Sequence, residues 1–103
     1  MEQVIVRYKV KPDRAAENVE LVRAVYDELE RSNPTGLRYA TFQLDDGVSF
    51  VHVAVHETDS ARSPLTALAA FKEFQREIAE RCEEHPKVTA MHEVGSYRFF
   101  DRG

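Results

Sequence analysis

The chain has 103 residues, 43% of them hydrophobic, and a net charge of −4 from 14 Lys and Arg against 18 Asp and Glu. This length predicts one domain spanning residues 1–103, and the absence of a basic run argues against a partner such as nucleic acid or an anionic membrane surface. Because Cys82 is the single cysteine and no apolar stretch could span a bilayer, an intrachain disulfide and a multi-cysteine zinc site are excluded, and we expect a cytoplasmic protein with no membrane contact.

The first third of the chain predicts a strand and then a helix. Residues 4–10 alternate, with Val4, Val6, Tyr8 and Val10 on one face, and Lys11-Pro12-Asp13 ends this strand. The helix begins at Pro12 or Asp13 and runs to about Ser32, where Asn33-Pro34-Thr35-Gly36 supplies turn residues. Its apolar stripe consists of Val19, Val22, Tyr26 and Leu29, widened by Ala15, Leu21 and Val25.

A hairpin follows, with strands at Leu37–Leu44 and Val48–Val55 joined by Asp45-Asp46-Gly47. A three-residue loop would place Phe42 opposite Phe50 and Ala40 opposite His52. A two-residue loop would place Gln43 opposite Phe50 and Thr41 opposite His52. We favour the first register because it pairs two aromatic side chains. Apolar residues on both faces predict a central position for the second hairpin strand.

The last part of the chain predicts a second helix and a long strand. After a polar connection over residues 57–62, Ser63 is the expected N-cap and Pro64 the first helical residue. The apolar stripe of this helix is Leu68, Phe71, Phe74, Ile78 and Cys82, and residues 83–86 end it. The last strand is expected from Val88 to about Phe100, with a bulge or bend at Gly95.

This element order predicts an α+β, ferredoxin-like βαββαβ fold. Right-handed crossovers place both helices on one face of a four-stranded antiparallel sheet. The other face carries Ile5, Val51 and Val53, and a second copy of the chain could cover it, giving a homodimer in which the long last strand reaches the partner. The alternative is a monomer whose open face is made polar by Arg7, Lys9 and Ser49.

Four stretches of sequence resemble the antibiotic-biosynthesis-monooxygenase-like domains of the dimeric α+β barrel group. They are residues 6–12, residues 50–56, Phe71-Lys72-Glu73-Phe74, and Val94-Gly95-Ser96-Tyr97. The resemblance covers roughly residues 4–100 and implies the fold more strongly than the chemistry, because these are packing motifs. It also implies a pocket between sheet and helices, used in that group either for oxidation of aromatic or quinol substrates by dioxygen without metal or flavin, or for haem degradation.

The chain departs from both patterns. Leu65 and Ala70 stand where many such domains carry histidines, and His56 replaces a common tryptophan at the end of the third strand. The positions of the haem ligand and of its partner asparagine hold Gln75 and Val6, and glutamine is a poor haem ligand. We therefore expect no cofactor.

His52 is the leading candidate for chemistry, because it interrupts an apolar strand and histidine titrates near neutral pH. It could act as a catalytic proton acceptor, or it could be a structural histidine bonded to a neighbour. His56 lies about 13 Å along the same strand, too far for the two to share a metal ion. We expect no metal site. The candidate substrate-binding residues are Tyr8, His56, Phe71 and Gln75.

Three functions remain open from the sequence. The first is a cofactor-independent monooxygenase acting on a small aromatic or quinol-like ligand. The second is a non-catalytic protein that binds such a molecule in the same pocket. The third is a dimeric interaction protein whose pocket is filled by its own side chains.

Overall fold

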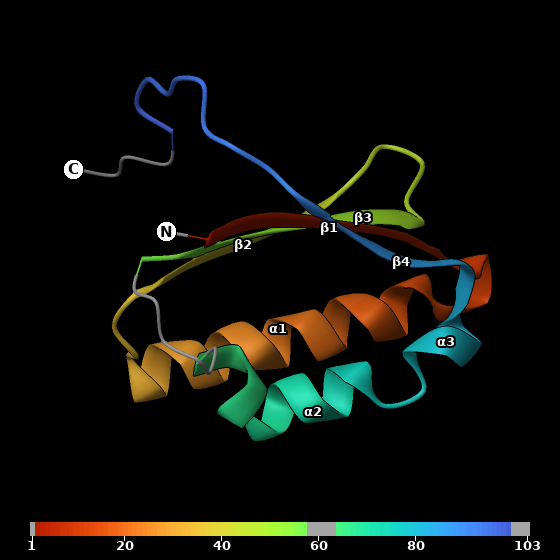
Figure 1. The fold of residues 1–103 in the computed structure, drawn as a ribbon. Coiled ribbons are helices and arrows are strands. Elements are labelled where there is room, and N and C mark those ends of the chain that lie inside the picture. The colour runs from red at the N-terminus through yellow and green to blue at the C-terminus, as the bar shows by residue number, and fades with distance from the viewer. Residues whose placement is uncertain (1, 58–63, 100–103) are drawn as a thin grey trace.

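A four-stranded antiparallel sheet covered on one face by helices forms the fold of the computed structural model, which describes residues 2–57 and 64–99 (Figure 1). The strands are β1 (Glu2–Val10), β2 (Leu37–Gln43), β3 (Ser49–His56) and β4 (Cys82–Ala90), in the spatial order β2-β3-β1-β4. The helices are α1 (Ala15–Ser32), α2 (Ala69–Gln75) and α3 (Ile78–Arg81). The predicted α+β, ferredoxin-like arrangement is confirmed, as is the central position of β3.

The core lies between α1 and the helix-facing side of the sheet. Tyr8 and Val10 of β1 are buried, as the alternation of that strand predicts. Val22 and Val25 of α1 pack against them, and both belong to the predicted apolar stripe of this helix. A 3₁₀ turn over Pro12–Arg14 leads into α1, whose C-cap residue Asn33 takes a left-handed conformation with φ 44°.

The hairpin adopts the register that we did not favour. Gln43 pairs with Phe50 and Thr41 with His52. The physical reason lies in the turn, where the Asp46 carboxylate accepts hydrogen bonds from the backbone N–H groups of Val48 and Ser49 at 3.0 and 2.8 Å. The Leu44 N–H also donates to the Ser49 carbonyl, so the turn is longer than three residues and shifts the pairing.

The second helical segment is not the single helix that we predicted. Pro64–Ala67 form a 3₁₀ turn, α2 ends at Gln75, and Glu77 takes a left-handed φ of 61° before α3. The break is held by Arg81, whose guanidinium donates to the carbonyls of Phe74 and Arg76 at 2.6 and 3.1 Å. These bonds satisfy carbonyls that a continuous helix would have bonded internally. The expected connection over residues 57–62 and the Ser63 cap fall largely outside the described residues, which include only Glu57 of that stretch.

The N-terminus of α2 is capped from α1 rather than by a local side chain. The Glu28 carboxylate accepts the backbone N–H groups of Ala69 and Ala70 at 3.3 and 2.8 Å. An acidic group at this end satisfies free N–H donors and complements the helix dipole. This contact connects the N-terminus of α2 to the C-terminal half of α1.

The last strand begins and ends earlier than predicted. β4 starts at Cys82, which pairs with Val10, and it ends at Ala90. The expected helix end at residues 83–86 is therefore strand, and Gly95 lies beyond it. Pro86 is tolerated because β4 is an edge strand and the register shifts there, with Arg7 opposite Lys87 and Lys9 opposite Glu84. Phe100, the expected end of the strand, lies outside the described residues.

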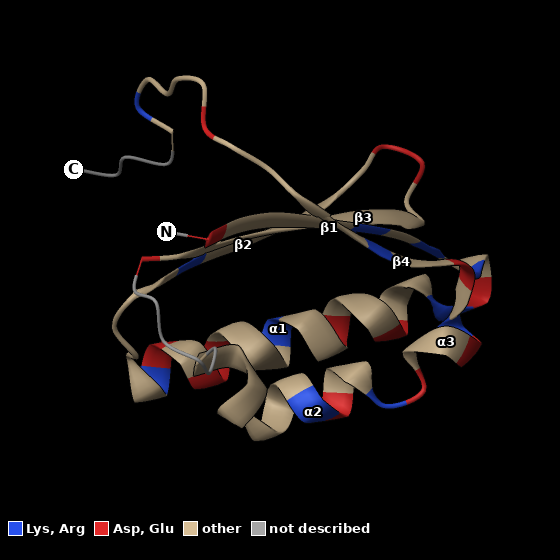
Figure 2. Cartoon of the chain, in the orientation of Figure 1, with Lys and Arg blue, Asp and Glu red and all other residues tan. Residues whose placement is uncertain are grey.

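The side of the sheet that faces away from the helices is half-buried and largely apolar. It carries Ile5, Ala40, Phe42, Val51, Val53 and Val55. Residues 91–99 continue from β4 on this side and leave Val94, Tyr97 and Phe99 exposed (Figure 1). Lys and Arg positions are interspersed with Asp and Glu along the helices (Figure 2). Within the described part of the chain, no helix has the length and apolar character needed to cross a membrane.

Candidate functional site

A cavity of about 550 Å³ lies between the sheet and the helices. Most of its wall is apolar, and the strands and helices both contribute to it. The apolar lining includes Val4, Val6, Ala54, Leu65, Phe74 and Ile78. A space of this size and character accommodates a small, mostly apolar molecule.

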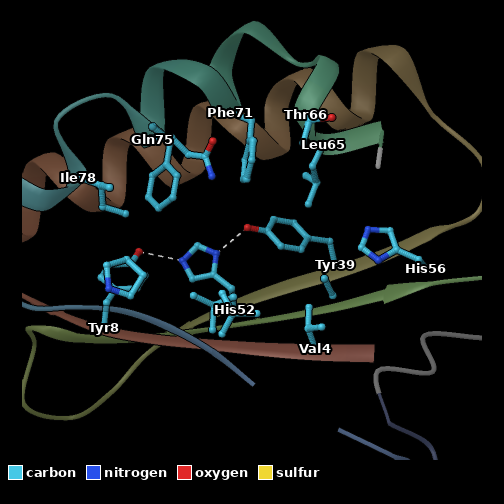
Figure 3. Close-up of a pocket in the computed structure, with 15 residues that line it drawn as sticks. Val4, Tyr8, Tyr39, His52, His56, Leu65, Thr66, Phe71, Gln75 and Ile78 are labelled. Carbon is cyan, nitrogen blue, oxygen red and sulfur yellow. Dashed lines mark hydrogen bonds between the residues drawn. The ribbon is translucent and has the colours of Figure 1, made fainter. Parts of the chain in front are cut away.

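The five candidate residues from the sequence all line this one cavity. They are Tyr8, His52, His56, Phe71 and Gln75. Figure 3 shows Tyr8, His52 and His56 on the strand side of the cavity, while Phe71 and Gln75 extend from α2 on the opposite side. Their roles remain predictions, but the fold brings together residues that are far apart in sequence.

His52 lies at the centre of the cavity floor, between two tyrosine hydroxyl groups. Its Nε2 is 2.8 Å from the Tyr8 hydroxyl oxygen, and its Nδ1 is 2.6 Å from the Tyr39 hydroxyl oxygen (Figure 3). The Thr41 hydroxyl oxygen is 3.2 Å from the same Nδ1. Both ring nitrogens are thus hydrogen-bonded, and the side chain is held in one orientation.

Burial sets the charge state of this floor. His52 is 4% exposed, and desolvation lowers its pKa to about 4, so the ring is neutral at pH 7. Desolvation also raises the pKa of Tyr8 and of Tyr39 well above the usual value, and it raises the pKa of Tyr26 to about 12. The floor therefore offers neutral groups that can each donate or accept a hydrogen bond.

Two buried polar residues extend the floor network away from the cavity. Asn18 of α1 is fully buried, and its Nδ2 donates to the Tyr8 hydroxyl at 2.9 Å. Arg81 is 1% exposed, and its Nε donates to Asn18 Oδ1 at 3.3 Å. The Arg81 guanidinium also lies over the Phe74 ring, 5.3 Å from its centroid. A continuous hydrogen-bonded network thus connects Arg81 to Tyr39 through Asn18, Tyr8 and His52.

The remaining candidate residues lie toward the edge of the cavity. His56 is at the end of β3, with its Nδ1 3.6 Å from a Glu2 carboxylate oxygen. Gln75 is exposed, and Phe71 is half-buried against Phe74 with ring centroids 6.1 Å apart. Among the described residues, no group of three or more His, Cys, Asp and Glu side chains is placed to hold a metal ion.

The sequence interpretation missed Asn18, Thr41 and Arg81. A signal for two of them exists in the helical spacing. Asn18 lies four residues before Val22 and therefore falls within the apolar stripe of α1. In the single helix that the sequence predicts, Arg81 follows Phe74 by seven residues and would likewise fall within the apolar stripe. A polar residue inside an apolar stripe indicates a buried hydrogen-bond partner, and both are such residues.

The fold and the helix–sheet cavity together define the class of structure, and comparison with known structures agrees. One similar structure is a crystal structure of an antibiotic biosynthesis monooxygenase, at TM-score 0.74 and 22% identity over 92% of this chain and all of that one. A protein from Nitrosomonas europaea, provisionally named as such a monooxygenase, matches at TM-score 0.76 and 22% identity with the same coverage. A provisionally named counterpart from Bacteroides thetaiotaomicron matches at TM-score 0.76 and 12% identity, over 90% of this chain and 89% of that one.

The chain therefore has the fold of the antibiotic-biosynthesis-monooxygenase-like domains, as its sequence resemblance implied. No protein-family model and no curated protein matches it. At these identities the likeness establishes the fold and not the activity.

Proposed function

We propose that the cavity binds a small aromatic or quinol-like molecule and that the protein is a cofactor-independent monooxygenase for it. The observation that carries this proposal is the placement of His52 and two tyrosine hydroxyls at the floor of an otherwise apolar cavity. Apolar walls suit an aromatic ring, and a few convergent polar groups suit one oxygen substituent on it. The fold shared with proteins named as monooxygenases supports the same choice.

The reaction that we propose draws all its electrons from the substrate. With a hydroxynaphthalene, dioxygen oxidises the ring carbon para to the hydroxyl group. One oxygen atom becomes the new carbonyl of the quinone, and the other leaves as water with two hydrogens from the substrate. The protein then has to bind the ring, exclude water and stabilise charge on the substrate oxygen.

Within this proposal, Tyr39 contacts the substrate oxygen and His52 acts through Tyr39. The His52 ring is 4% exposed and is bonded on both nitrogens, so it orients its tyrosine partners. Tyr39 is half-buried and lines the cavity, so its hydroxyl is the polar group of this pair that a ligand can reach. From the sequence, His52 is a candidate catalytic proton acceptor. We propose instead that His52 is a positioning residue on which turnover depends.

The experiment that tests the proposal is oxygen consumption with 1-naphthol. Wild-type protein should consume one dioxygen per 1,4-naphthoquinone formed, at a rate above that of naphthol alone. Ala54→Phe should abolish this rate, because the new ring occupies the cavity that Ala54 lines. Ala24→Phe is the matched control, since Ala24 is exposed on α1. Equal rates in both variants would overturn the cavity as the site of reaction.

A second candidate function is binding without catalysis. It is favoured by the state of His52, because both ring nitrogens are occupied and desolvation lowers the pKa of the ring to about 4, which makes it a weak base. His52→Ala separates the two functions. Loss of turnover with retained 1-naphthol binding supports the monooxygenase. Binding by wild-type protein without any oxygen consumption supports the binder.

We also infer that the apolar open face of the sheet packs against a second copy of the chain. Val53 lies on this face among other half-buried apolar side chains. Residues 91–99, which include the exposed Tyr97 and Phe99, continue on the same side. Light scattering should give a dimer for the wild type and for Ala24→Glu, and a monomer for Val53→Glu. A monomeric wild type would contradict the inference and would favour the monomer with an open face. The expected cytoplasmic location stays a prediction.

A further inference from the structure

We propose that Arg81 and Asn18 fix the proton positions of the whole floor network, so that Tyr39 is presented to the cavity as a hydrogen-bond donor. The ligand that this site accepts then carries an acceptor oxygen, either a ketone carbonyl or a phenolate, at the position facing Tyr39. This inference rests on the proposed function for the claim that an aromatic molecule enters the cavity. The proton positions themselves follow from the protein alone.

Arg81 determines the direction of hydrogen-bond donation in the network. A guanidinium can only donate hydrogen bonds, so the Asn18 side-chain atom 3.3 Å from Arg81 Nε is the carbonyl oxygen. The amide of Asn18 is thereby oriented, and its Nδ2 faces the Tyr8 hydroxyl at 2.9 Å. Because an amide nitrogen donates, the Tyr8 oxygen accepts this hydrogen bond.

The next step places the Tyr8 proton. Tyr8 is 2% exposed, and within residues 2–57 and 64–99 its hydroxyl bonds only to Asn18 and His52. Asn18 already donates to it, so His52 Nε2 at 2.8 Å is the acceptor for the Tyr8 proton. A buried hydroxyl proton without an acceptor is unfavourable, because the group has lost its hydrogen bond to water. His52 Nε2 is therefore unprotonated.

A neutral imidazole carries one proton, so the proton of His52 is on Nδ1. This Nδ1–H donates to the Tyr39 oxygen at 2.6 Å, with the Thr41 oxygen as a longer alternative at 3.2 Å. The Tyr39 oxygen therefore accepts a hydrogen bond, and its own O–H group is available to donate one. The Thr41 hydroxyl bonds to the Tyr26 hydroxyl at 2.7 Å and also interacts with Tyr39. A ligand oxygen in the cavity can compete for the Tyr39 proton.

The charge of Arg81 points to the same class of ligand. Arg81 is 1% exposed, and its hydrogen bonds in the described part of the chain go to an amide oxygen and two carbonyls, with no carboxylate among them. A buried cation whose hydrogen bonds go to uncharged oxygens favours electron-rich atoms nearby. The hydrogen bonds from Arg81 to Tyr39 are all donated in the same direction. At the cavity, this direction favours a carbonyl or phenolate oxygen over a group that donates a hydrogen bond.

Nitrogen-15 NMR of the His52 ring in the wild-type protein at pH 7 tests the network directly. The nitrogen couplings to the ring protons show which nitrogen is protonated, and we expect Nδ1–H. Asn18→Asp should reverse the network, because a carboxylate accepts from both Arg81 and Tyr8, and Tyr8 must then accept from His52 Nε2–H. Asn33→Asp adds the same charge at the end of α1 and should leave the tautomer unchanged. Nε2–H in the wild type would overturn the proposal whether or not Asn18→Asp folds.

Calorimetric binding of 1-tetralone and naphthalene tests the ligand class. The two have similar ring systems, and only tetralone carries an acceptor oxygen. Wild-type protein and Asn33→Asp should bind tetralone about tenfold more tightly than naphthalene, and Asn18→Asp should lose this preference while it retains naphthalene binding. An unchanged preference in Asn18→Asp would overturn the acceptor assignment. If the wild type binds neither compound, the proposed function and the ligand class both fail, and the NMR result still decides the proton positions.

Discussion

The hydroxyl oxygen of Tyr39 lies 2.6 Å from His52 Nδ1, although the two residues are not directly opposite each other in the sheet. In the hairpin, His52 pairs with Thr41, and Tyr39 pairs with Ala54. The contact is therefore diagonal, and it exists because tyrosine is long enough to cross to the neighbouring pair on the same face. With the register that pairs Phe42 with Phe50, His52 would lie opposite Ala40, so the observed register is required for the cavity floor.

Replacing Tyr8 by phenylalanine should destabilise the protein. The substitution keeps the ring but leaves the Asn18 amide and His52 Nε2 buried without their hydroxyl partner. We expect a loss of about 1–3 kcal/mol in the free energy of unfolding, measured by urea denaturation. Tyr97→Phe is the control, because Tyr97 is exposed on the C-terminal segment. Equal stabilities of the two variants would show that the Tyr8 hydroxyl is not part of a buried network.

The protein should lose stability as the pH falls below 6.5. Desolvation lowers the pKa of His52 from 6.5 to about 4 in the folded state, so between these values the unfolded chain binds a proton that the folded chain does not. The contribution is fully present above pH 6.5 and is lost toward pH 4, with a total of up to about 3 kcal/mol.

Comparison with His52→Gln isolates this contribution from that of the carboxylates. Between pH 6.5 and 5, the free energy of unfolding should fall more steeply for the wild type, by about one proton or 1.4 kcal/mol per pH unit at most. His92→Gln is the matched control, because His92 is exposed on the C-terminal segment. Parallel profiles for wild type and His52→Gln would contradict the buried, neutral state of His52.

The hairpin turn should depend on Asp46 and not on its neighbour Asp45. The Asp46 carboxylate accepts hydrogen bonds from Val48 N, Ser49 N and Ser49 Oγ, and these bonds lower its pKa to about 2. Asp46→Ala should lower the midpoint of thermal unfolding, whereas Asp45→Ala should leave it near the wild-type value. The difference should diminish as the pH falls from about 4 toward 2, because protonation removes the acceptor. Equal midpoints at pH 7 would contradict this role.

Glycine at position 77 should stabilise the protein. Glu77 has φ 61°, a left-handed conformation that costs on the order of 1 kcal/mol for a residue with a Cβ atom. We expect Glu77→Gly to raise the free energy of unfolding by about 0.5–1 kcal/mol, and Glu80→Gly within α3 to lower it. If both variants lose stability equally, the break between α2 and α3 is not as described.

The sequence predicts those features that depend on local periodicity. The alternation of β1 places Tyr8 on the helix-facing side, and the spacing in α1 identifies Val22 and Val25 as core residues. His52 stands out for the same reason, as a polar residue in an apolar strand. These predictions succeed because burial on one face leaves a period of two or 3.6 in the sequence.

The features that the sequence does not predict depend on contacts between distant residues. The hairpin register follows from the Asp46 carboxylate, and the break after α2 follows from Arg81 donating to carbonyls of residues 74 and 76. The early start of β4 depends on pairing of Cys82 with Val10, which places Pro86 in an edge-strand irregularity. The connection from Arg81 through Asn18 to the cavity joins three elements, so no single stretch of sequence contains it.

A crystal structure of the protein with 1-naphthol tests the proposed binding site. We predict that the ring occupies the cavity between α2 and the sheet, against Phe71 and Phe74, with its oxygen within hydrogen-bonding distance of the Tyr39 hydroxyl. A cavity that stays empty at saturating 1-naphthol, or a ligand bound elsewhere on the molecule, would contradict the proposed function of this cavity.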